Sequence, residues 1–288
     1  MIAVTGATGG IGGGVARRLA EAGVAQRLVV RDPSRAPQLD GAEVAVATYA
    51  DGDALRAAFS GADSMLFVSG HEDADRVSLH RGVVEAAVDA GVRRVVYTSF
   101  QGAAPDCTFT FGRDHFHTEN VISDAGLDFT FLRDSIYADF LAFFPGADGV
   151  IRAPAGDGRV AAVARADVAR VAATVLLDGS GAHDGARYDL TGPEALTVAE
   201  AAEILSAHAP IPITYEAETL EEAYASRASY GAPDWEVAGW VTSYAAIATG
   251  ELEAVSDAVE RVTGTPATGL DALLTADRPA WSQLTAEP

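Results

Sequence analysis

The sequence of 288 residues contains no lysine, so all 20 of its basic residues are arginine. This absence excludes every mechanism that depends on a lysine side chain. Cysteine is nearly absent as well: Cys107 stands alone, so the chain cannot form a disulfide within itself, and we expect a reducing, cytoplasmic setting. No apolar run approaches the ~20 residues of a membrane-spanning helix, so we expect no membrane span.

Positive charge is scarce, because 41 acidic residues leave a formal net charge of −21. Such a surface repels nucleic acid and anionic membranes, and we expect neither as a partner. Hydrophobic residues make up 49% of the chain, which is enough for a full core. We leave open whether the chain forms a homodimer.

Short apolar segments alternate with helical patterns over the first two-thirds of the chain. The segments expected to form strands are 2–5, 27–31, 43–48, 64–69, 93–99, 128–133 and 187–192. The segments expected to form helices are 13–23, 53–61, 77–91, 111–126 and 164–179. Strands that are apolar throughout and joined by helices predict an α/β fold with a doubly wound parallel sheet, Rossmann-like, covered on both faces.

The last third of the sequence is expected to be mainly helical. Thr197 and Glu200 have the spacing of a capping box, which predicts a helix ending near His208, and 212–217 is the one expected strand. We expect residues 1–195 to form the Rossmann-like domain and residues 196–288 a small substrate lobe that does not fold independently. The segment 139–162 is expected to contribute to the substrate cleft.

Residues 5–14, TGATGGIGGG, join the first expected strand to the first expected helix. In register the loop reads Gly6-x-x-Gly9-x-x-Gly12. The first glycine permits a tight turn, the second lets backbone N–H groups approach a pyrophosphate, and the third lets the helix pack closely on the strand. A helix N-terminus attracts an anion even in an acidic chain. The alternative is a flexible glycine turn. The pattern predicts a nicotinamide dinucleotide site formed by Gly6, Ala7, Thr8, Gly9, Gly10, Ile11 and Gly12.

The second expected strand ends in VVRDPSR. An NAD site normally has an acidic residue here that binds the ribose hydroxyls. This chain instead has Arg31, with Arg35 four residues later, and a guanidinium can bind a 2′-phosphate with two parallel hydrogen bonds. Asp32 comes one position too late for the NAD role, and we expect it to cap a short helix. The pattern favours NADP(H) over NAD(H), the alternative being two solvated arginines.

The GxxGxxG spacing within VTGATG and the following residues resembles the short-chain dehydrogenase/reductase superfamily, and its atypical, NmrA-like branch in particular. Ordinary members use a Tyr-x-x-x-Lys pair on the helix after strand five, in which the lysine lowers the pKa of the tyrosine that protonates the carbonyl oxygen. Here that helix contains neither residue. The usual catalytic pair is therefore absent.

The chain resembles the type 2 NADPH:quinone oxidoreductases and the triphenylmethane reductases of that branch. The resemblance rests on the missing Tyr-Lys pair and on three segments, RDPSRA (31–36), TSF (98–100) and FTFLRDSIYADF (129–140). The likeness is strongest in 1–35, 93–140 and 155–169 and fades in the last 70 residues. By position, the resemblance implies that the cofactor or substrate cleft is lined by Ser69, Ser99, Arg133, Ser135, Ile136, Tyr137 and Arg165. Thr48 and Asn120 depart from the family, where an aspartate and a lysine are common.

Other reactive side chains have weaker claims. Tyr137 follows the end of a strand, where doubly wound folds bind ligands. We expect it either to contact the substrate, by packing on its ring or by donating a hydrogen bond in catalysis, or to be an aromatic residue of the core. His115 and His117 diverge on a helix, so a shared metal is not expected. His115 and Glu119 have the spacing for a surface hydrogen bond. Cys107 has no histidine partner in the pattern and is expected to be inert.

Two function classes follow. The first is an NADPH-dependent reductase that transfers hydride to quinones or similar conjugated electrophiles without a Tyr-Lys pair. The second is a non-catalytic NADP(H)-sensing regulator, as other NmrA-like members are. The resemblance implies NADP(H) as the cofactor in both cases, and no metal is expected.

Overall fold

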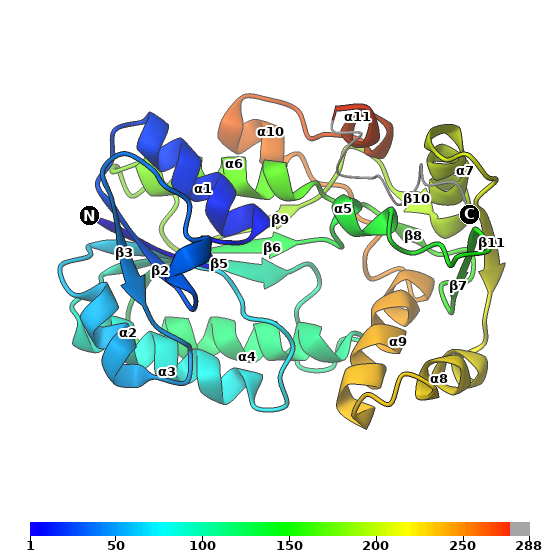
Figure 1. Cartoon of the computed structure of the whole chain (residues 1–288), viewed down its shortest axis with the longest axis horizontal. Coiled ribbons are helices and arrows are strands. Elements are labelled where there is room, and N and C mark those ends of the chain that lie inside the picture. Colours follow the sequence, from blue (N-terminus) through cyan, green and yellow to red (C-terminus); the bar gives the residue numbers. More distant parts are fainter. Residues whose placement is uncertain (277–288) are drawn as a thin grey trace.

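The computed structural model describes residues 1–276, and its centre is a seven-stranded sheet with a smaller lobe at the carboxyl edge of the strands (Figure 1). The strand order is β3-β2-β1-β4-β5-β6-β9, and every neighbouring pair is parallel. The predicted doubly wound parallel sheet is thus confirmed. The strands are β1 (Ile2–Thr5), β2 (Gln26–Val30), β3 (Ala42–Val46), β4 (Ser64–Phe67), β5 (Arg94–Phe100), β6 (Asp128–Asp134) and β9 (Ala186–Leu190).

Helices cover both faces of the sheet (Figure 1). One face packs against α1 (Gly10–Glu21) and α6 (Arg165–Leu177), and α10 (Ala258–Thr263) lies against α6. The other face packs against α2 (Gly52–Phe59), α3 (Arg76–Asp89) and α4 (Thr110–Asp124). Side chains alternate along each strand, so two separate cores form. Leu66 and Val96 belong to the α1–α6 side, whereas Phe67 and Tyr97 belong to the other.

The smaller lobe is assembled from two separate parts of the chain. Residues between β6 and α6 form α5 (Ala138–Leu141), β7 (Val150–Ala153) and β8 (Arg159–Val160). β7 pairs in parallel with β11 (Thr214–Ala217), and β8 pairs antiparallel with β10 (Leu196–Thr197). The lobe also contains α7 (Val198–His208), α8 (Leu220–Ala228), α9 (Asp234–Ala248) and α11 (Leu270–Ala276). Both parts contribute to one buried apolar cluster.

The sequence predicted the long elements of the fold, and short elements account for the differences. Every expected strand and helix forms, with ends shifted by a few residues, and α1 begins at Gly10, earlier than expected. The capping box at Thr197 is present, and Asp32 caps the short helix η1 (Pro33–Arg35). The elements α5, β7, β8 and β10 were not expected, because two to four residues carry no periodicity.

Contacts cross the expected division at residue 195: part of the first region packs in the smaller lobe, and part of the second region packs on the sheet's helices. The segment 138–163 pairs with the C-terminal strands, and α10 returns to pack on α6. Residues 277–288 of the expected lobe lie outside the described residues. Within residues 1–276, none of the helices combines the length and apolar character needed to cross a bilayer.

Candidate functional site

A cavity of about 700 Å³ opens at the carboxyl ends of β1 and β4. The chain passes from β1 outward to β2 and β3 and then returns to β4 on the other side of β1. Ligands of open α/β sheets bind at such a reversal of strand order. One part of the wall, the glycine half, consists of Gly6, Gly9, Gly10, Ile11, Gly12 and Arg165. The opposite part, the aromatic half, consists of Phe100, Phe109, Phe111, Phe144, Trp240 and Tyr244.

The glycine half is formed largely by bare backbone. Gly6 has φ of +63°, a conformation that favours glycine. A Cβ on Gly12 would overlap the Gly6 carbonyl, so Gly12 is needed for α1 to pack against β1. A Cβ on Gly9 would meet only the Gly6 carbonyl oxygen, at 3.4 Å, and otherwise open space. Gly9 is the N-cap of α1 and provides no side-chain cap. The first-turn N–H groups therefore lie at the cavity wall, available to an anion.

Arg165 brings a positive charge to this backbone cradle. A Cβ on Gly10 would lie 3.4 Å from the Arg165 guanidinium, so the two residues are adjacent. Asp139 orients the arginine: its Oδ1 accepts from Arg165 Nε at 2.9 Å, and its Oδ2 accepts from the Arg165 backbone N–H at 2.8 Å. Neither Nη atom has a hydrogen-bond partner among the described residues. The guanidinium is thus fixed by one edge and free to bind an anion with the other.

Other residues expected in the cleft divide into two groups. Ser69, Ser99, Ser135 and Ile136 line the cavity, as do Gly6, Gly9, Gly10, Ile11 and Gly12 of the loop. The Ser135 hydroxyl is buried and has no hydrogen-bond partner in the described part of the chain, so it is available to a ligand. Ala7, Thr8 and Arg133 are not on the cavity wall.

Arg133 is held elsewhere by an ion pair. Its Nε and Nη2 donate to the two carboxylate oxygens of Glu119, at 2.9 and 2.7 Å. Glu119 also accepts from the Ser99 hydroxyl at 2.6 Å. The sequence expectation that Glu119 bonds His115 at the surface is wrong, because Glu119 and His115 are 3% and 6% exposed and have other partners. Arg133 therefore orients Ser99 from behind the wall.

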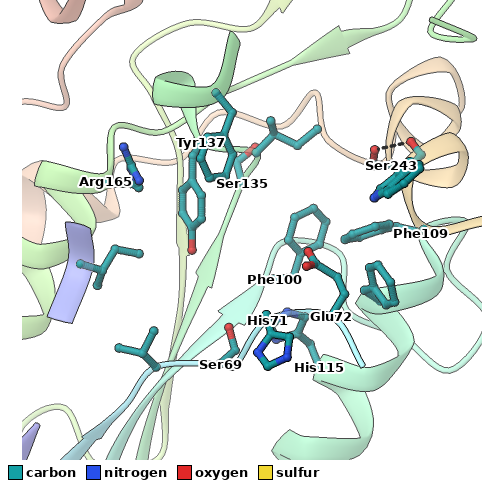
Figure 2. A pocket seen from close by; sticks show the side chains of 18 of the residues that line it. Ser69, His71, Glu72, Phe100, Phe109, His115, Ser135, Tyr137, Arg165 and Ser243 are labelled. Carbon is teal, nitrogen blue, oxygen red and sulfur yellow. Dashed lines mark hydrogen bonds between the residues drawn. The ribbon is translucent and has the colours of Figure 1, made fainter. Parts of the chain in front are cut away.

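Tyr137 lies where the two halves of the cavity meet. Figure 2 shows its ring between Arg165 on one side and Phe100 and Phe109 on the other. The Tyr137 hydroxyl donates to Asp134 Oδ2 at 2.9 Å. Asp134 is 1% exposed, and its other carboxylate oxygen has no hydrogen-bond partner among the described residues. Burial raises the pKa of Asp134 well above its usual value, and burial together with Asp134 raises the pKa of Tyr137.

The aromatic half combines residues from β5, the start of α4, the segment after α5, and α9. The Phe100 and Phe109 rings pack with centroids 4.8 Å apart, and Phe109 meets the edge of Phe111 at 5.6 Å. A Cβ on Gly239 of α9 would overlap the Phe111 ring, so this glycine lets the ring pack against the helix. Trp240 lines the cavity from the same helix. A flat, conjugated molecule is the ligand that such a wall accommodates.

Beneath the aromatic half lies a buried polar cluster that the sequence did not predict. Arg76 Nη2 lies 3.3 Å from His115 Nε2, and His115 Nδ1 lies 2.9 Å from the Tyr97 hydroxyl. Because arginine only donates, Nε2 accepts and Nδ1–H donates, so His115 is the neutral Nδ1–H tautomer. Burial and the positive charge of Arg76 lower the pKa of His115 well below its usual value. His115 and Arg76 both line the cavity.

Four remaining candidates are not on the cavity wall: His117, Cys107, Arg31 and Arg35. His117 is exposed and is not on its wall. Cys107 is buried, donates to the Phe109 carbonyl at 3.3 Å, and has its pKa raised by burial, which agrees with an unreactive thiol. Arg31 and Arg35 are exposed just beyond β2 and form no ion pair with another described residue. Their expected contact with a 2′-phosphate stays a prediction.

Comparison with known proteins places the chain among nicotinamide-dependent reductases. A family model described as NAD(P)H-binding matches residues 6–179. Quinone oxidoreductase 2 of Escherichia coli is 34% identical over 277 residues, which covers 94% of this chain and 96% of the relative. An NAD(P)H azoreductase of Xenophilus azovorans is 34% identical over 272 residues, covering 93% of this chain and 94% of the relative.

Solved structures give the same result. The NADPH complex of the Escherichia coli NADPH-dependent quinone oxidoreductase has a TM-score of 0.86 at 32% identity, covering 96% of this chain and 99% of that one. Triphenylmethane reductase of a Citrobacter species has a TM-score of 0.82 at 32% identity, with the same coverage. The resemblance inferred from the motifs is therefore confirmed.

Proposed function

The chain belongs to the NAD(P)H-binding family, and we propose that it is an NADPH-dependent reductase that transfers hydride to quinones and similar conjugated electrophiles. The observation that carries this proposal is the shared cavity, in which a backbone cradle with a fixed arginine faces a wall of aromatic rings. The nearby relatives named for quinone, azo and triphenylmethane reduction act on different acceptors that share extended conjugation. We place the protein in the cytoplasm, where a lone cysteine stays reduced.

The described residues fit a nicotinamide dinucleotide at the glycine half. The open space at Gly9 and the uncapped N-terminus of α1 suit a pyrophosphate, and the free edge of Arg165 supplies the positive charge. The unpartnered Ser135 hydroxyl lies farther along the wall, where a polar group of the cofactor or acceptor can satisfy it. Arg31 and Arg35 are assigned to the 2′-phosphate. When bound, NADPH supplies a hydride to the acceptor.

The protein's own contribution to the reaction is positioning and exclusion of water. The aromatic half holds a flat acceptor, and Tyr137 lies between that acceptor's place and the glycine half. The raised pKa makes Tyr137 a neutral phenol and a weak acid. Hydride addition to a ketone leaves a strongly basic alkoxide that needs a proton donor as it forms, whereas addition to a quinone leaves a ring-stabilised phenolate. Only the second reaction suits this cleft.

The test compares acceptors whose reduction requires a proton donor, such as ketones, with quinones, whose reduction does not. NADPH oxidation is measured with a benzoquinone, a naphthoquinone, an aliphatic ketone and an aldehyde, in wild type and in Tyr137→Phe. We expect turnover of quinones only, and a loss in Tyr137→Phe smaller than the ~100-fold that a general acid contributes. Faster turnover of the ketone would refute the proposal.

The alternative, a non-catalytic NADP(H) sensor, has no specific support in the residues described. A sensor needs the glycine half alone, whereas this cavity continues into an aromatic wall of a size suited to a second ligand. Tight NADPH binding without turnover of any acceptor would favour the sensor.

A further inference from the structure

Arg76 is the only buried arginine in residues 1–276, at 6% exposure, and it has no acidic partner there. It is the first residue of α3, at the carboxyl edge of the sheet. Other arginines of the described chain form ion pairs with carboxylates, for example Arg133, Arg165 and Arg227, but Arg76 forms none. A buried charge without a counter-ion is costly to keep. The position therefore calls for a ligand.

The existing contacts of Arg76 leave much of its guanidinium unused. Nη2 donates to the Gly70 carbonyl at 3.3 Å and to His115 Nε2 at 3.3 Å. Nε is buried with no partner, and Nη1 has none within the described residues. The Phe111 ring lies 5.9 Å from Cζ, a cation–π contact that offsets part of the charge. His115 stays neutral beside it and cannot act as a counter-ion.

None of the acidic side chains in residues 1–276 forms an ion pair with Arg76. Glu119 is occupied by Arg133 and Ser99. Asp114 interacts with Arg76 only at a distance beyond an ion pair, and burial raises its pKa. Glu72 also lines the cavity, without an ion pair to Arg76. The whole chain carries −21, so only a local charge can draw an anion into this cavity.

We infer that Arg76 binds an anionic group on the acceptor, so that the preferred substrates are conjugated molecules carrying a carboxylate, sulfonate or phosphate. This inference rests on the proposed function and specifies its substrate class. Arg76 shares the wall of the cavity with Phe100, Phe109 and Phe111, so a ring on the aromatic half can present its anionic substituent to the guanidinium. Nη1, which makes no hydrogen bond to the described residues, can donate to an oxygen of that substituent, whereas Nη2 is occupied and Nε is buried.

The experiment compares a naphthoquinone sulfonate with the parent neutral naphthoquinone. Wild type, Arg76→Gln, Arg76→Lys and Arg81→Gln are assayed for kcat/KM with each acceptor at saturating NADPH. Arg81→Gln is the matched control, because Arg81 is on the same helix, exposed and outside the cavity wall. We expect Arg76→Gln to lower the ratio of kcat/KM for the sulfonate to kcat/KM for the neutral quinone roughly tenfold or more. Arg76→Lys should restore part of this ratio, and Arg81→Gln should leave it unchanged.

Two results would overturn the inference: an unchanged ratio in Arg76→Gln, or an equal fall of the ratio in Arg81→Gln. If the ratio is unchanged because kcat/KM falls equally for both acceptors, Arg76 is assigned to the reaction itself. A fold defect is checked by thermal unfolding, where removal of an unpaired buried charge should not lower Tm.

A readout without turnover separates this inference from the proposed function. Calorimetric titration of the sulfonate into the NADP⁺-saturated protein should show binding that Arg76→Gln weakens by the same factor. If neither quinone is reduced but this binding loss is seen, the proposed function fails and the anion site stands. If quinones are reduced but Arg76→Gln binds the sulfonate normally, the anion site fails alone.

Discussion

The two halves of the cavity are built in opposite ways. The glycine half comes from one continuous segment, the loop after β1 and the first turn of α1, completed by Arg165. The aromatic half comes from β5, the start of α4, the segment after α5 and α9, so residues more than a hundred positions apart in the sequence share one wall. Local backbone geometry defines the first half, and packing between distant elements defines the second. A cofactor site of the first kind can be kept while the acceptor changes.

Filling the space at Gly9 should separate the two halves most clearly, because it changes only the glycine half. We expect Gly9→Val to weaken NADPH binding by about 2–3 kcal/mol, or roughly 30- to 150-fold, because the branched side chain occupies the approach to the backbone. The fold should remain, since a Cβ there meets only the Gly6 carbonyl oxygen at 3.4 Å. Cofactor titration and circular dichroism measure the two effects.

Gly12→Val is the contrasting variant, because its side chain would overlap the backbone at Gly6. It should lower Tm as well as binding. If Gly9→Val binds NADPH normally, the loop does not hold a phosphate, and the glycine half has been misassigned.

Arg165→Met tests whether the positive charge beside Gly10 binds the pyrophosphate, which NADPH and NADH both contain. A lost charge-assisted contact costs about 1.5–3 kcal/mol. We expect affinity for NADPH and NADH to fall by similar factors, because both contain the pyrophosphate. Isothermal titration with each cofactor gives the two factors, and Arg170→Met, on the same helix but away from the cavity, is the control. A fall confined to NADPH would move Arg165 to the 2′-phosphate.

Arg31→Ala should have the complementary effect. We expect NADPH affinity to fall about tenfold while NADH affinity is unchanged, because Arg31 is assigned to the 2′-phosphate alone. The effect is smaller than at Arg165, since Arg31 is exposed and its charge is screened by solvent. Equal NADPH affinity in Arg31→Ala and wild type would contradict the assignment.

Asp134, at the boundary between the halves, gives the smallest effect, on stability and its pH dependence. Its pKa is raised in the folded protein. The stability it contributes is therefore present below its unfolded pKa and is lost as pH rises through the folded value. We expect Asp134→Asn to be more stable than wild type at neutral pH and equal to it near pH 3. Urea unfolding across pH measures it, with exposed Asp128→Asn on the same strand as control. A constant difference at all pH values would refute the raised pKa.

The same division explains what the sequence could and could not predict. Gly9 and Gly12 have roles set by neighbours within seven residues, so their spacing alone indicated the fold of the loop. Family resemblance placed Arg165 and Tyr137, which both line the cavity. The roles of Arg76 and Asp134 depend on burial by distant elements, and no local pattern shows burial of a charged residue.

Two wrong expectations have the same origin. The spacing of His115 and Glu119 fits a surface pair on a helix, but α4 is covered by the sheet and by α9, and each residue has partners from other elements. The family resemblance implied that Arg133 lines the cleft, yet its guanidinium pairs with Glu119 instead. Helical and strand periodicity determine which residues share a face, not what covers that face.

The central claim is that one cavity holds NADPH and a conjugated acceptor together. The most direct test is anaerobic reaction of the NADPH-saturated protein with naphthoquinone, with NADPH and hydroquinone both quantified. We expect one hydroquinone formed for each NADPH consumed, and no consumption with an aliphatic ketone. Tight NADPH binding with no oxidation by any quinone would contradict it.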